Sequence, residues 1–204
     1  MPGRNVNKIY LEESYYHVYG RGHNKGVVFR DDDDYAVFLN LFKRYLSNKP
    51  VQDKKGREYP WLQKEVDLLV FCLMPNHFHA LIYQRNSDAM TKLFKSVITT
   101  YGMYFNKKYK CVGPVFQGRF KASMIDRDNY LMHISRYIHL NPKNYERWAF
   151  SSLPFYLGRQ KAEWLKPDSI LEFFDGRIDY RKFVEDYENH KKMFDEIKEE
   201  LANY

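Results

Sequence analysis

The sequence predicts an α+β fold, a ferredoxin-like sandwich in which helices pack on a central antiparallel sheet, with a helical extension at its C-terminal end. Three observations support this prediction. Strand and helix patterns follow in the order strand, helix, strand, strand, helix, strand, helix. The short connection Met74-Pro75-Asn76 joins two strand patterns, as in an antiparallel hairpin. After Trp148 only helix and turn patterns occur, so we place a main domain at residues 1–147 and a helical extension at residues 148–204.

The first half of the chain is predicted to form a strand, a helix and a strand hairpin. Aromatic and β-branched residues dominate the strand segments. A run of aspartates places negative charge at the positive end of a helix dipole, and apolar residues then recur at helical spacing. The predicted elements are strands at residues 14–20, 65–73 and 77–84, a helix that starts at residues 31–34, and an exposed loop at residues 49–60.

The second half adds two helices, one strand and the extension. Ser87 and Asp88 form an N-cap region for a long helix, and Pro142 ends the last helix of the main domain because it disfavours helical geometry at the preceding residue. The predicted elements are helices at residues 88–108 and 128–141, a strand at residues 120–125, turns or short helices at residues 151–158 and 167–175, and a polar amphipathic helix at residues 178–202.

Positive charge is concentrated in the first 159 residues. Residues 1–159 hold 25 Lys or Arg against 14 Asp or Glu, whereas residues 160–204 hold 8 against 12. The basic part also carries most of the 18 tyrosines and 15 phenylalanines. Basic charge interleaved with aromatic rings suits nucleic acid, above all single strands, whose bases stack on rings. The alternative is a solvated basic surface over an aromatic core.

Several other classes of protein are disfavoured. No apolar run approaches the roughly 20 residues that span a membrane, and no secretory apolar region follows the first residues. Cys72 and Cys111 are too few for a disulfide framework or a zinc knuckle. The chain also lacks the Gly-Lys-Ser/Thr loop that cradles nucleotide phosphates. We therefore expect a cytoplasmic protein with no membrane partner that does not hydrolyse nucleotides.

The pair His77 and His79 is the first candidate for chemistry. Alternate side chains of a strand share a face, so both imidazoles are expected to point the same way and to supply half of a metal site. The alternative is a pair of structural histidines. Tyr137 and Asn141 are four residues apart on the last predicted helix and share a face of it. If this face meets the histidine strand, the amide oxygen of Asn141 would complete a site of two histidines and one oxygen. Most tyrosines on a helix face, however, belong to a core.

Three segments together resemble a known family. Residues 72–81, Cys-Leu-Met-Pro-Asn-His-Phe-His-Ala-Leu, resemble the His-hydrophobic-His motif of HUH nucleases, and in particular of the single-tyrosine transposases. Residues 115–121 resemble the stretch after the long helix of that family, and residues 129–142 resemble its catalytic helix. The resemblance covers residues 14–147, with the segments in the family order, and is greatest to the REP-associated tyrosine transposases, which pair with short hairpin repeats.

The resemblance implies a role for each matched residue. Tyr137 corresponds to the nucleophile, and His77, His79 and Asn141 correspond to ligands of a divalent metal ion, Mg²⁺ or Mn²⁺. Other basic residues are predicted DNA contacts, either from matched family positions or from their place in a basic loop or helix. These are Arg119 and Lys121, Arg21 and Lys25, and Lys95. The alternative for Arg21 and Lys25 is an ordinary basic loop. An arm with Arg4 and Lys8 could also reach DNA, although chain termini are usually just mobile.

The expected function is a metal-dependent single-stranded DNA endonuclease and strand transferase, a transposase that recognises hairpin DNA. By resemblance, Tyr137 forms a 5′-phosphotyrosine and strands are rejoined, as in DNA transposition and recombination. Within the enzyme class, the alternative is a plasmid-type replication or mobilisation nuclease. In another class, it is a catalytically silent, domesticated module that binds hairpin DNA or RNA. The protein is expected to be a monomer or a homodimer, because some relatives exchange the tyrosine helix between subunits.

Overall fold

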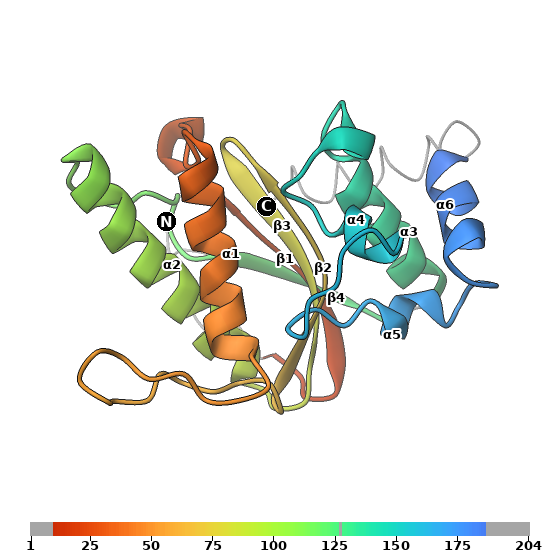
Figure 1. The fold of residues 1–204 in the computed structure, drawn as a ribbon, viewed down its shortest axis with the longest axis horizontal. Coiled ribbons are helices and arrows are strands. Elements are labelled where there is room, and N and C mark those ends of the chain that lie inside the picture. The colour runs from red at the N-terminus through yellow and green to blue at the C-terminus, as the bar shows by residue number, and fades with distance from the viewer. Residues whose placement is uncertain (1–9, 127, 187–204) are drawn as a thin grey trace, which may run out of the picture.

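The computed structural model describes residues 10–126 and 128–186 (Figure 1). The predicted α+β class is confirmed, with the expected order of elements in the main domain. The predicted arm with Arg4 and Lys8 lies outside the described residues. The elements are β1 Ser14–Arg21, the 3₁₀ helix η1 His23–Lys25, α1 Asp32–Leu46, β2 Val66–Met74, β3 His77–Gln84, α2 Ala89–Tyr109, β4 Lys121–Ile125, α3 Asp128–Leu140, the 3₁₀ helix η2 Tyr145–Arg147, α4 Leu153–Tyr156, α5 Asp168–Leu171 and α6 Arg177–Glu185.

The sheet has four strands in the order β2-β3-β1-β4, and each neighbouring pair is antiparallel. This order is the one expected of a ferredoxin-like fold. It places β1 between β3 and β4, so side chains of β1 lie beside the histidine strand. In the register, Arg21 pairs with His77, and Tyr19 pairs with His79 on one side and Lys121 on the other. Directly paired residues point to the same face of a sheet, so these five side chains share one face.

Helices cover both faces of the sheet (Figure 1). Helices α1 and α2 lie against one face, and α3 lies against the other, followed by the short helices α4, α5 and α6. Asp31 caps the start of α1, where its side chain accepts a hydrogen bond from Asp34 N at 3.1 Å, as the aspartate run predicts.

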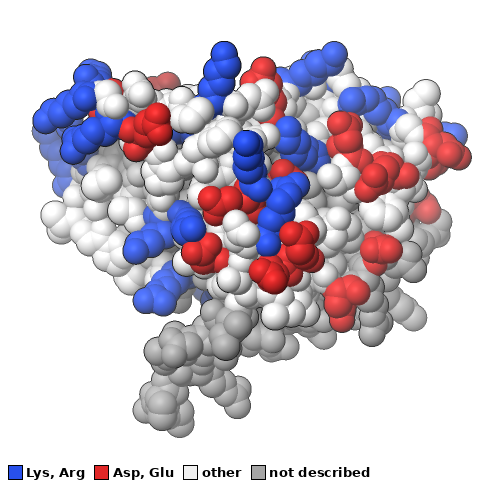
Figure 2. All heavy atoms as spheres, turned by 90° about the horizontal axis from the view of Figure 1, so that it is seen from below, with Lys and Arg blue, Asp and Glu red and all other residues white. Residues whose placement is uncertain are grey.

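The two sides of the molecule differ in charge (Figure 2). Lys and Arg gather toward the left edge of this view, the side on which α2 lies in Figure 1, and Asp and Glu are more frequent on the side of α5 and α6. This distribution agrees with the basic main domain and acidic extension of the sequence. In the described part of the chain, no helix is long and apolar enough to cross a membrane.

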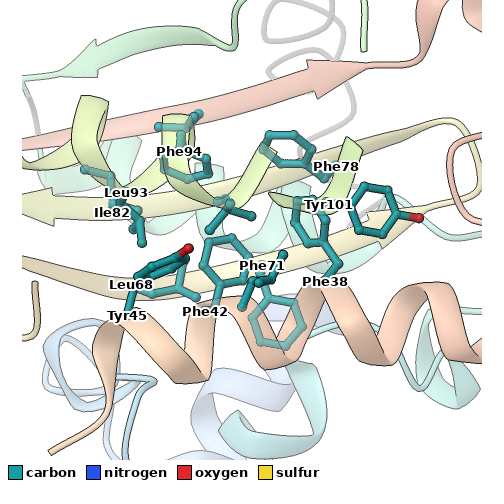
Figure 3. Close-up of a cluster of buried hydrophobic side chains, with 14 of the residues drawn as sticks. Phe38, Phe42, Tyr45, Leu68, Phe71, Phe78, Ile82, Leu93, Phe94 and Tyr101 are labelled. Atoms are coloured by element: carbon teal, nitrogen blue, oxygen red, sulfur yellow. The ribbon is translucent and has the colours of Figure 1, made fainter. Parts of the chain in front are cut away.

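Aromatic rings fill the core between the sheet and helices α1 and α2 (Figure 3). Phe38 and Phe42 of α1 reach across to Phe78 of β3 and Phe94 of α2. Tyr101 of α2 is also buried there, and its hydroxyl donates to the carbonyl of Val28. Tyr101 is therefore a core residue.

The extension continues the sheet and then packs on α3. Residues 150–152 run along the edge of β2, where Leu73 N donates to Phe150 O and Ser152 N donates to Phe71 O, both at 2.9 Å. The indole of Trp148 donates to Leu73 O at 2.9 Å and fixes the start of this segment. Apolar residues of α4, α5 and α6 share a second core with α3. The predicted helix at residues 178–202 is seen as α6, and residues 187–204 lie outside the described part.

Candidate active site

Strand β3 carries both histidines of the motif on the face that α3 covers. The rings of His77 and His79 have centroids 5.0 Å apart, as the alternation of side chains along a strand predicts. Phe78 between them points to the opposite face and is fully buried against Phe94 of α2. Phe78 therefore holds β3 against the core on one face, while His77 and His79 point toward α3 on the other.

Helix α3 brings a tyrosine and an amide to the same place. Asn141 directly follows α3, and its Oδ1 lies 3.1 Å from Nε2 of His77. Tyr137 lies one turn earlier, and its ring stands at 83° to that of His79 with the centroids 5.5 Å apart. The structure thus brings these four side chains together. The face of α3 that carries Tyr137 and Asn141 packs on the histidine strand, which is the arrangement that the site requires.

The phenol of Tyr137 is only 6% exposed. Burial, with a smaller contribution from Tyr19, raises the pKa of Tyr137 to about 12. A hydrogen bond with Asn141 opposes this shift and lowers the pKa of Tyr137, because it favours the charged phenolate. The phenol is therefore protonated at neutral pH, and its proton has to leave when the oxygen acts as a nucleophile.

Asn76 determines which nitrogen of His77 carries the proton. Its Nδ2 donates to the carbonyl of Lys25 at 3.2 Å, which turns its Oδ1 toward Nδ1 of His77 at 2.6 Å. Burial lowers the pKa of His77, so the ring holds a single proton at neutral pH, on the nitrogen that faces Asn76. Nε2 of His77 then presents a lone pair to Oδ1 of Asn141, which is also an acceptor.

Two acceptor atoms that face each other at 3.1 Å fit a cation between them. In an octahedral site with metal–ligand bonds of about 2.1 Å, adjacent ligand atoms lie roughly 3 Å apart. Among residues 10–126 and 128–186, no group of three His, Cys, Asp or Glu side chains is arranged to hold a metal. The amide oxygen of Asn141 is in position to serve as a third donor beside His77 and His79. This donor set suits a hard divalent cation that keeps water or phosphate oxygens as its other ligands.

Three residues of the site were missed in the sequence analysis. His17 and Tyr19 of β1 lie on the same face as the histidine pair, and Nε2 of His17 lies 2.9 Å from Nδ1 of His79. Asn76, in the turn before β3, holds His77 as described above. The alternation of His17, Tyr19 and Arg21 in the first strand segment was the signal that could have found the first two.

The predicted DNA contacts fall into two groups. Arg21 is exposed at the end of β1, opposite the first histidine of the motif, and Lys121 shares the histidine face at the start of β4. Arg119 and Lys25 are exposed in loops that meet β1 near this end, where Gln117 N donates to Arg21 O at 2.7 Å. Lys95 is exposed on α2, in the helical layer on the other side of the sheet. The structure therefore brings the first four toward one end of the sheet and leaves Lys95 apart.

The loop between β1 and α1 has a close backbone approach at Gly22. Gly22 N donates to Asn76 O at 2.8 Å, and a Cβ at Gly22 would lie 2.0 Å from the carbonyl oxygen of Gly26. Only glycine fits there without displacing the backbone. This contact holds the loop with Arg21 and Lys25 against the turn that precedes His77.

A second side of α3, away from Tyr137, carries polar residues that the extension buries. His139 lies 2.8 Å from the Tyr180 hydroxyl through Nδ1 and 2.7 Å from Ser152 Oγ through Nε2. Arg136 donates to the carbonyls of Phe183 and Asp186 at 3.1 and 3.2 Å. His139 thus points away from the candidate site. The helix that carries Tyr137 is held from behind by residues of the same chain.

Comparison with known proteins agrees with this geometry. Residues 59–141, which include the histidine pair, Tyr137 and Asn141, match the family model described as transposase IS200 like. This segment is similar to the IS200-like transposases. This match confirms the family resemblance that the sequence motifs indicate. A comparison with curated protein sequences finds no match.

One solved transposase structure shares the fold of this chain. A structure of a REP-associated tyrosine transposase bound to a REP hairpin superposes with a TM-score of 0.54 at 14% identity, covering 77% of this chain and 87% of that chain. A putative transposase from Deinococcus radiodurans R1 gives a TM-score of 0.40 at 12% identity, covering 68% of this chain and 95% of that chain. The first of these supports the ferredoxin-like arrangement of the main domain, and the second has too low a score to add to it.

Proposed function

We propose that this protein is a metal-dependent single-stranded DNA endonuclease and strand transferase that uses Tyr137 as its nucleophile. One observation carries the proposal. Tyr137 and Asn141, from the end of α3, meet His77 and His79 of β3 in one cluster, although more than 50 positions separate the two segments in the sequence. The match to the IS200-like transposase family supports the same reading.

The chemistry follows from the phenol. Tyr137 Oη attacks a backbone phosphorus, an oxygen–phosphorus bond forms to the tyrosine, and the bond from phosphorus to the 3′ oxygen breaks. The phenol loses one proton and the departing oxygen gains one, so the products are a 5′-phosphotyrosine and a free 3′-hydroxyl. A phosphodiester is exchanged for another phosphodiester. A second 3′-hydroxyl can therefore reverse the step and join strands without nucleotide hydrolysis.

His77, His79 and Asn141 are the residues that would hold Mg²⁺ or Mn²⁺. When bound, the cation would polarise the scissile phosphate and neutralise charge on its oxygens. Asn141 has a second effect, because its hydrogen bond to Tyr137 favours the phenolate against the effect of burial. The covered position of Tyr137 limits water at the nucleophile and keeps the phenol on the site face of α3.

The proposed substrate is a DNA hairpin with an adjoining single strand. Arg21 and Lys121 lie on the site face or its rim, where positive charge would contact the backbone phosphates next to the cleaved bond. Lys25 and Arg119, in the loops at this end of the sheet, would extend the phosphate contacts. The hairpin bound by the structurally similar REP-associated transposase supports the choice of a stem-loop. The role of Lys95, on the far helical layer, stays a prediction.

We also propose that a single chain supplies all residues of the site, and that the protein is located in the cytoplasm. The extension buries the back of α3 with Arg136 and His139, so the tyrosine helix is fixed to the sheet of its own subunit. The free cysteines Cys72 and Cys111 are compatible with a reducing compartment.

A covalent-adduct assay tests the proposal. The protein is incubated with hairpin oligonucleotides from the DNA that flanks its gene, with Mg²⁺ or Mn²⁺, and the products are separated on denaturing gels. We expect a metal-dependent adduct in the wild-type protein and in Tyr104→Phe, a control on α2, but none in Tyr137→Phe, which should still bind the hairpin. Hairpin binding with no adduct under any metal would favour the silent binding module.

A further inference from the structure

We propose that His17 is a positioning residue that fixes the ring orientation and the proton of His79, so that the other ring nitrogen of His79 faces the metal position. This inference deepens the proposed function and rests on it. The observation that carries it is the buried contact between two imidazoles that belong to neighbouring strands, one of which lies outside every motif of the sequence.

The contact is a hydrogen bond, not a chance proximity. His17 Nε2 lies 2.9 Å from His79 Nδ1, and the two rings are stacked at 23° with centroids 5.1 Å apart. The register explains this geometry. His79 pairs with Tyr19, and His17 lies two residues before Tyr19 on β1, so its side chain is on the same face of the sheet. His17 is 1% exposed, so the contact is shielded from water.

The direction of this hydrogen bond determines which nitrogen of His79 can bind a cation. A neutral imidazole has one N–H and one lone pair. If Nδ1 of His79 donates to His17, the lone pair of His79 is on Nε2, the nitrogen left to face the cluster. His77 is arranged in the same way, since its Nδ1 faces the acceptor Oδ1 of Asn76 at 2.6 Å. Both histidines of the motif thus have Nδ1 engaged by a separate residue, and both keep Nε2 for the metal.

Two other roles for His17 fit the structure less well. As a metal ligand through Nε2, His17 would lose its contact with His79 Nδ1. As plain core filling, it would bury a polar ring where an apolar side chain would cost less. A buried residue that orients a metal-binding histidine through a hydrogen bond typically contributes 10- to 100-fold, approximately, to metal affinity.

Binding of Mn²⁺ to the full chain without DNA tests this role directly, by electron paramagnetic resonance of free and bound ion. His17→Leu removes the acceptor and keeps an apolar volume, whereas His17→Gln places an amide oxygen near the position of Nε2. We expect Mn²⁺ affinity to fall by about 10- to 100-fold in His17→Leu and to be largely restored in His17→Gln. Tyr101→Phe, which loses one buried hydrogen bond on the other side of the sheet, is the matched control and should keep wild-type affinity.

The outcomes separate this inference from the proposed function. Wild-type protein that binds no Mn²⁺ would overturn the metal assignment and the role of His17 with it. If the wild-type protein binds Mn²⁺ and His17→Leu binds it with equal affinity, only the role of His17 would be overturned. The same follows if His17→Gln loses as much affinity as His17→Leu, because the hydrogen-bond acceptor would then not be what matters. Melting temperatures of the metal-free variants show whether each is folded at the temperature of the assay.

Discussion

The hydroxyl of Tyr180 is the best place to test whether the extension holds the nucleophile helix. It contacts His139 Nδ1 at 2.8 Å and Ser135 Oγ at 3.1 Å, both on α3, and all three side chains are fully buried. One arrangement of protons satisfies these contacts: His139 donates to Tyr180, Tyr180 donates to Ser135, and Ser135 donates to Met132 O at 2.7 Å. Burial lowers the pKa of His139 to about 3, so this ring is neutral and has one proton to donate.

Tyr180→Phe removes the acceptor of that proton without changing the ring. A buried donor left without a partner costs about 1–3 kcal/mol. We therefore expect the free energy of unfolding to fall by about 2 kcal/mol, which corresponds to roughly 4–8 °C in melting temperature for a chain of this size. The loss is local to α3, so its amides should exchange hydrogen faster. Adduct formation should also slow, because a displacement of about 1 Å at the nucleophile can cost up to ~100-fold in rate.

Hydrogen exchange followed by mass spectrometry measures this effect on α3. The control is Tyr101→Phe, which loses a buried hydroxyl bonded to Val28 O on the other face of the sheet. Both variants should be less stable than the wild type, but only Tyr180→Phe should expose the amides of residues 128–140 and slow adduct formation. Equal protection of α3 in the two variants would refute the idea that the extension positions Tyr137.

Three further predictions follow from the site and from the core. Mixing Tyr137→Phe with His79→Ala should give no adduct beyond that of either protein alone, since each chain completes its own site; restored activity would show an exchanged helix. In titrations of a hairpin with a single-stranded flank, Arg21→Ala should slow cleavage more than Lys95→Ala, and the reverse order would move the DNA path to the layer of α2. Burial favours the neutral form of Asp34, but hydrogen bonds from the backbone of Arg30, from Lys108 and from Tyr109 outweigh it and hold its pKa below the ordinary value. The carboxylate therefore stabilises the fold above the unfolded-state pKa of about 3.9, and this contribution is lost as pH falls through the depressed value. In urea unfolding, Asp34→Asn should be less stable than the wild type at pH 7, by a margin that shrinks below about pH 4; a margin independent of pH would contradict the assignment.

Local patterns predicted much of the fold because the segments carry their own signals. The aspartate run before α1, the proline after Asn141 and the alternation along β3 each depend on neighbours in the sequence, and the structure has these elements where they were expected. The sheet order followed from the element order, since few topologies connect such a series. The helix face with Tyr137 and Asn141 was also readable, because residues four apart share a face.

The contacts between distant segments could not be read in the same way. The bond between His17 and His79 depends on the register of two strands that are not adjacent in sequence, and no motif includes His17. The contacts of Arg136 and His139 depend on where the extension returns to α3, which helix patterns alone do not specify. An arginine between the apolar positions of this helix was the available signal, because such a side chain needs fixed acceptors once it is buried.

Identification of the residue joined to DNA tests the central claim most directly. The adduct formed on a hairpin oligonucleotide is digested with protease and nuclease, and the linked peptide is sequenced by tandem mass spectrometry. We expect a nucleotide attached through its 5′ phosphate to Tyr137. Attachment to Tyr19, the other tyrosine beside His79, or attachment through a 3′ phosphate would contradict the mechanism.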